Sequence, residues 1–108
     1  MRRTSLTKRH GVSIVREMKA AMLHAGIPII DVYLFGSLAT GKTHPLSDID
    51  VAVVYQPFNR DPLEERRIIR RKRQRFDVPM DIVCLRREDM DNKYSTVVQE
   101  VKRHGIPV

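Results

Sequence analysis

Two aspartates separated by one residue begin an apolar run, and a Gly-Ser pair ends the apolar run before it. The aspartates are Asp48 and Asp50 in "DIDVAVVY", and ten residues separate them from Gly36 and Ser37 in "YLFGS". Side chains two apart on a strand point to the same face, so these carboxylates are expected side by side. Like charges this close repel unless a cation lies between them. Carboxylates are hard oxygen ligands that suit Mg²⁺, so the stretch predicts a magnesium site.

The Gly-Ser pair supplies the other half of such a site. Glycine lets the backbone come close to a ligand, and N–H groups that open a helix hold phosphate oxygens with help from a serine hydroxyl. A third carboxylate would complete an arrangement with two metal ions. Asp81 is the first candidate because it begins the third apolar run, "MDIVCL". Asp77 is the alternative, although Pro79 separates it from that run.

The strands that position these residues follow from runs of β-branched and aromatic side chains. Residues 28–35, 48–55 and 79–86 are such runs, with turn residues at their ends, and each predicts a buried strand. Residues 36–41, "GSLATG", predict a turn that leads into one or two helical turns.

Three longer segments predict helices. Residues 8–25 have apolar side chains at helical spacing and are followed by Gly26. A second helix is expected from Asp61 to about residue 75, with Asp61 as N-cap and Glu64 as the acid of a capping box. The third begins near Tyr94 and ends at Gly105. The order predicts an α/β or α+β fold, a small mixed sheet packed with helices, in one domain over residues 1–108.

The motifs together resemble the signature of the DNA polymerase β-like nucleotidyltransferase superfamily. The spacing and the short chain are similar to its minimal nucleotidyltransferases, often found as the MntA-type partner of a HEPN-domain protein. The resemblance implies a palm-like nucleotidyltransferase fold in which Gly36 and Ser37 hold the triphosphate of ATP or another NTP. It also implies that Asp48 and Asp50 bind two Mg²⁺ ions and that Asp81 completes the metal site.

By the same resemblance, the chain would transfer a nucleoside monophosphate, with AMP the first choice, from an NTP to a hydroxyl and release pyrophosphate. The expected acceptor is a protein hydroxyl of a HEPN-type toxin, with this chain as its antitoxin. A homo-oligomer is the alternative way to complete the site. Residue types do not choose between a protein, a small molecule and an RNA end as the acceptor.

The positive charge gathers in one segment. The formal net charge is +7, and residues 66–75, "RRIIRRKRQR", hold seven Arg or Lys and no acid. The remaining chain has thirteen basic and thirteen acidic residues. Such a segment suits a polyanion or an acidic partner, so the alternative function is a non-catalytic module that neutralises a partner or binds nucleic acid through Arg66–Arg75.

Cysteine content and hydropathy indicate the cellular compartment of the protein. Cys84 is the single cysteine, which excludes an internal disulfide and favours a reducing compartment. No apolar stretch approaches the roughly 20 residues needed to cross a bilayer. The expectation is therefore a cytoplasmic protein without a membrane partner.

Overall fold

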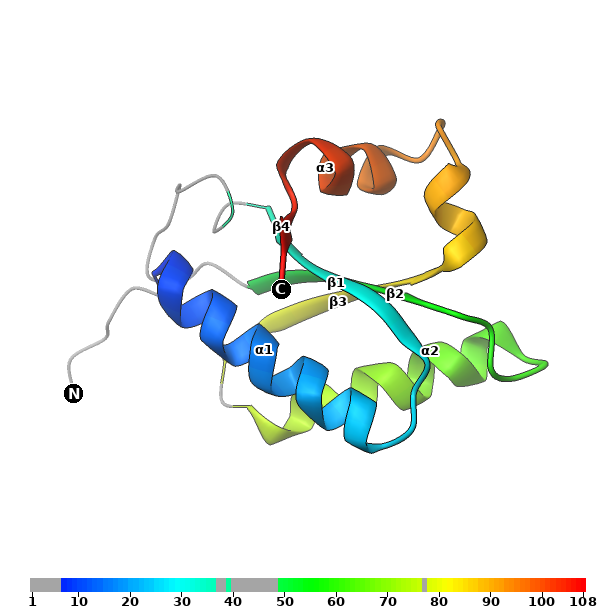
Figure 1. Cartoon of the computed structure of the whole chain (residues 1–108), viewed down its shortest axis with the longest axis horizontal. Helices are drawn as coiled ribbons and strands as arrows, with labels where there is room; N and C mark the ends of the chain where they lie inside the picture. Colours follow the sequence, from blue (N-terminus) through cyan, green and yellow to red (C-terminus); the bar gives the residue numbers. More distant parts are fainter. Residues whose placement is uncertain (1–6, 37–38, 40–48, 77) are drawn as a thin grey trace.

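Three α-helices and four strands make up the part of the chain that the structure describes (Figure 1). The computed structural model describes residues 7–36, 39, 49–76 and 78–108. In chain order the elements are α1 (Lys8–His24), β1 (Ile29–Phe35), β2 (Ile49–Tyr55), α2 (Pro62–Arg71), the 3₁₀ turn η1 (Lys72–Arg75), β3 (Met80–Arg86), the 3₁₀ turn η2 (Arg87–Asp91), α3 (Thr96–His104) and β4 (Ile106–Pro107). The predicted order of helices and strands is confirmed. The turn expected over residues 36–41 lies largely outside the described residues.

The strands form one mixed sheet in the order β3-β2-β1-β4. β1 is antiparallel to both β2 and β4, whereas β2 and β3 are parallel. β4 was not predicted, because two residues after Gly105 are too short a run to signal a strand. The C-terminus is nevertheless held to β1, since the Val108 N–H donates to the Val32 carbonyl at 2.9 Å.

Helices cover both faces of the sheet and create two cores. Figure 1 shows α1 and α2 on one side of the sheet and α3 on the other. Because side chains alternate along a strand, one set of strand residues enters each core. The larger core contains Val15, Met18, Met22, Val32, Leu34, Ile49, Val51, Val53, Tyr55, Ile69 and Ile82, among others. The smaller core, under α3, consists of Phe35, Ala52, Val54, Leu85, Val98 and Val101.

The start of α2 differs in one detail from the sequence prediction. The Asp61 side chain does cap the helix, because it accepts a hydrogen bond from the Leu63 N–H at 3.0 Å. Glu64 does not complete a capping box: its carboxylate binds the Arg67 guanidinium, while the Asp61 N–H donates to Asn59 Oδ1 at 2.9 Å. An arginine one turn away is a stronger partner for a carboxylate than a neutral backbone N–H.

The ends of α2 and α3 also differ from the predicted bounds. α2 ends at Arg71, and the segment continues to Arg75 only as a 3₁₀ turn. α3 begins at Thr96, with Ser95 as its N-cap, so Tyr94 lies before the helix and is 84% exposed. The Lys93 ammonium lies over the Tyr94 ring, 5.6 Å from its centroid. No helix in the described ranges is long and apolar enough to cross a membrane.

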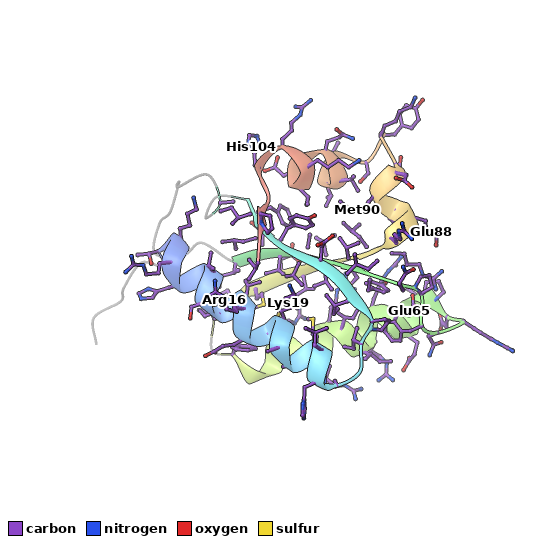
Figure 2. The ribbon with its side chains drawn as sticks, viewed as in Figure 1. Arg16, Lys19, Glu65, Glu88, Met90 and His104 are labelled. Atoms are coloured by element: carbon purple, nitrogen blue, oxygen red, sulfur yellow. The ribbon has the colours of Figure 1, made fainter. Side chains whose placement is uncertain are left out.

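Glu65 is a completely buried carboxylate that ties three segments together. Figure 2 labels it near the end of the sheet where β2 and β3 finish. It accepts hydrogen bonds from the backbone N–H groups of Phe58 and Asn59 and from Arg86 Nε, which lies 2.7 Å away. The chain that leaves β2, the first turns of α2 and the end of β3 therefore share one ion pair. Burial alone would raise the pKa of Glu65, but the bonds from Arg86 and the two N–H groups outweigh it and lower that pKa.

We predict that Glu65→Gln lowers the free energy of unfolding by about 3 kcal/mol at neutral pH, because it leaves Arg86 without its buried partner. The pKa of Glu65 is lower in the folded than in the unfolded chain. Its stabilisation is therefore complete above the ordinary glutamate pKa of about 4.3 and is lost as the pH falls through the lower folded value. Urea unfolding of both proteins at several pH values measures this difference.

Glu64→Gln is the matched control, since the Glu64–Arg67 pair lies at the surface and is expected to contribute little. Equal losses of stability in the two variants, or a loss at Glu65 that does not change with pH, would show that the buried pair has no special role.

Candidate active site

Three strands begin or end together at one end of the sheet. β1 ends there at Phe35, while β2 and β3, which are parallel, both begin there. The Ile49 N–H donates to the Pro79 carbonyl at 3.0 Å, which fixes the beginning of β2 against the segment that enters β3. The residues that the sequence singled out for chemistry come from these ends.

Asp50 and Asp81 are cross-strand neighbours. Each is the second residue of its strand, and the register pairs Asp50 with Asp81 directly. Paired residues of adjacent strands direct their side chains to the same face, and the strands lie about 4.8 Å apart. Asp81 is exposed and Asp50 is half-buried, so the two carboxylates occupy an accessible position. The pair could bind a divalent cation between its oxygens.

The same register places these carboxylates at the rim of the smaller core. Phe35 is the partner of Asp50 on β1, and Ala52 follows Asp50 on the same face of β2. Phe35 is 8% exposed and packs with Ala52 under α3. The sequence did not identify Phe35 as a neighbour of the site, because only the pairing of β1 with β2 brings it beside Asp50.

Gly36 lies against the Asp50 side chain and has a left-handed backbone. Its φ is +75°, a value that favours glycine. A Cβ at this position would lie 2.9 Å from Asp50 Cγ and would overlap a carboxylate oxygen of the same residue. Both conditions favour glycine, and they bring the backbone of Gly36 close to the Asp50 side chain.

The remaining predicted site residues, Ser37, Asp48 and Asp77, lie outside the described residues. The expectation that Asp48 stands beside Asp50 therefore stays a prediction. Within the described ranges no three His, Cys, Asp or Glu side chains form a group suited to a metal ion. If a metal ion binds here, Asp50 and Asp81 can offer it one carboxylate each, and any further ligand would come from another residue, water or substrate.

A hollow on the described surface lies away from these carboxylates. It measures about 570 Å³ and borders Gln56 and Pro57, which follow the end of β2, together with Asp31, Glu88 and Met90. Because Asp50 is at the beginning of β2, this hollow is at the opposite end of that strand. The candidate site lies instead at the strand ends that carry Asp50 and Asp81, which we call the carboxylate end of the sheet.

Comparison with known proteins identifies the family. Residues 15–105 match the model of the nucleotidyltransferase domain, so the chain belongs to the nucleotidyltransferase domain family. Nucleotidyl transfer is the class of reaction that this membership assigns to the protein. A search of curated proteins gave no match.

Solved structures agree with this assignment. One crystal structure is of a protein from Sulfolobus solfataricus that has been assigned as a nucleotidyltransferase. It superposes with a TM-score of 0.67 at 17% sequence identity, over 93% of this chain and 80% of that one. At this identity the likeness shows the fold alone.

Two toxin-antitoxin structures are more similar in sequence. One, solved with AMP-PNP, is 28% identical with a TM-score of 0.58, over 84% of this chain and 69% of that one. The other, a tyrosine-to-alanine mutant of the toxin-antitoxin MntA-HpeT, is also 28% identical with a TM-score of 0.58, over 86% of this chain and 70% of that one. The resemblance to MntA-type minimal nucleotidyltransferases is thereby confirmed.

We predict that Gly36→Ala removes nucleotidyl transfer while the chain still folds. The added Cβ would displace the Asp50 carboxylate and strain a backbone with positive φ. Transfer of label from α-labelled ATP measures the effect, and circular dichroism checks the fold.

Gly26→Ala is a matched control for this change. Gly26 also has a positive φ, +84°, but a Cβ there would meet nothing within 4 Å. It should cost about 1 kcal/mol of stability through backbone strain and leave transfer unchanged. Equal activity of the two variants would contradict the close approach of Gly36 to the site.

Proposed function

We propose that the protein is a Mg²⁺-dependent nucleotidyltransferase that moves AMP from ATP to a hydroxyl of a partner protein, as the antitoxin of a toxin-antitoxin pair. The single observation that carries the proposal is the pairing of Asp50 with Asp81 beside Gly36, whose left-handed backbone lies against Asp50. Two carboxylates on one face, with a glycine backbone close beside one of them, suit a metal-bound nucleotide.

Each residue of the motif has a distinct role in this proposal. Gly36 and Ser37 hold the triphosphate, and Asp48 and Asp50 hold two Mg²⁺ ions, with Asp81 as the third carboxylate. Asp81 is exposed, so it lies where an acceptor can approach, whereas the half-buried Asp50 is kept in place by Phe35 and Gly36. Bound Mg²⁺ supplies positive charge where negative charge develops on the transferring phosphoryl group.

The reaction exchanges one phosphorus–oxygen bond for another. The acceptor oxygen forms a bond to the α-phosphorus of ATP as the bond to pyrophosphate breaks, and the hydroxyl proton passes to water. Residues at the carboxylate end of the sheet need only hold the nucleotide and direct the acceptor in line with the leaving group.

The comparison structures support the choice of nucleotide and acceptor. One related toxin-antitoxin was solved with AMP-PNP, an ATP analogue, which supports ATP as the substrate. The other pairs MntA with a second protein, which supports a partner protein as the acceptor. A HEPN-domain toxin with an acceptor tyrosine is the partner we propose.

We predict that Asp50→Asn and Asp81→Asn each lower transfer roughly a thousandfold, since losing a metal ligand removes several kcal/mol of transition-state stabilisation. Asp48→Asn should act in the same way. The assay follows label from α-labelled ATP, with Mg²⁺, into the product of the neighbouring gene or into a lysate of the source cells. Chelation of Mg²⁺ should abolish the signal of the unaltered protein.

Asp91→Asn is the matched control, because Asp91 is an exposed carboxylate at the end of η2, beyond the far end of β3. Full transfer by Asp50→Asn would refute the metal assignment. Label that enters RNA and no protein would leave the reaction class intact and refute the protein acceptor.

A further inference from the structure

A groove on α2 is lined almost entirely by arginine. We call it the arginine groove: a hollow of about 410 Å³ whose wall consists of Leu63, Arg66, Arg67, Arg70, Arg71 and Arg73. None of these six residues carries a negative charge. Much of the excess positive charge of the chain is therefore collected around one concave surface.

Most of these guanidinium groups are not engaged within the protein. Arg67 is paired with Glu64, and Arg70 Nε donates to the Ile82 carbonyl at 3.2 Å. In the described part of the chain, the side chains of Arg66, Arg71 and Arg73 form neither a hydrogen bond nor an ion pair. Like charges held this close repel one another, so an anionic ligand in the groove would relieve a standing cost.

The groove lies along the outer edge of the sheet. β3 is the outermost strand on its side, and the bond from Arg70 to Ile82 fixes the groove against it. Ile82 is the residue after Asp81, so the groove begins close to the candidate active site without including its carboxylates. A ligand held by α2 can therefore be bound separately from the nucleotide.

The lining chemistry selects the class of ligand. A guanidinium presents a planar fork of donors that matches phosphate oxygens in pairs, and several forks in a row suit a chain of phosphates. Stable protein interfaces have an apolar core, and here the lining offers one apolar side chain, Leu63. No aromatic ring lines the groove on which unpaired bases could stack.

We propose that the arginine groove binds the phosphodiester backbone of a double-stranded nucleic acid, without reading its sequence. This binding goes beyond the proposed transfer reaction and does not depend on it. It adds to the enzyme a surface that would keep it close to duplex RNA or DNA, beside the edge of β3.

The test is the affinity of the whole protein for a labelled RNA duplex, measured by fluorescence anisotropy across a range of salt. With about four phosphates neutralised, affinity should fall roughly a hundredfold between about 50 and about 200 mM salt. Arg71→Gln with Arg73→Gln should weaken binding and lower the slope against salt by about two. Arg71→Lys with Arg73→Lys should keep the slope but weaken binding, because the charge remains and the fork is lost.

The control removes two equivalent charges from the other side of the sheet. Lys102→Gln with Arg103→Gln alters two exposed cations of α3 and should leave RNA affinity nearly unchanged. An equal loss in this control would show general attraction to a basic protein and would overturn the proposal. Polyglutamate that displaces the duplex at equal charge concentration would overturn it too, in favour of an acidic protein partner.

Asp50→Asn tests this proposal independently of the transfer reaction, since neither Asp50 nor Asp81 lines the groove. The variant should bind the duplex as tightly as the unaltered protein while it loses transfer. Loss of duplex binding in Asp50→Asn would contradict a site on α2.

Discussion

The parallel register of β2 and β3 is the constraint on which the candidate site depends. It pairs Asp50 with Asp81, and a shift by one residue would turn one of the two carboxylates to the opposite face. The register is held by the larger core, where Ile49, Val51 and Val53 face the same helices as Ile82 and Cys84. Burying these apolar side chains fixes the strands, and the carboxylates on the other face are aligned as a consequence.

Both ends of the strands are fixed, but by different means. At the end distant from the carboxylates, Glu65 and Arg86 form a buried ion pair that also binds the loop after β2. At the carboxylate end, close contact of Gly36 with Asp50 takes that role. The first contact resists unfolding, and the second holds the half-buried Gly36 against the carboxylate of Asp50.

Charge is separated in this small fold as clearly as apolar surface is. The carboxylates lie on the face that α3 covers, while the arginines of α2 belong to the opposite face and reach the edge of β3 through Arg70. Because of this separation, the arginines do not neutralise the carboxylates. Arginines beside the carboxylates would compete with a metal ion for them. The separation also leaves an anionic and a cationic surface on opposite faces of the sheet.

Apolar periodicity and turn residues are local signals, so they were enough to predict the helices, three of the four strands and a set of candidate site residues. The sequence suggested Asp81 as a partner for Asp50 but could not establish the register, which depends on burying side chains far apart in the chain. It missed β4, whose two residues form a strand only because β1 offers a free edge, and misassigned Glu64 and Tyr94. Tertiary structure decided these points, since long-range packing chooses among partners that local sequence leaves equivalent.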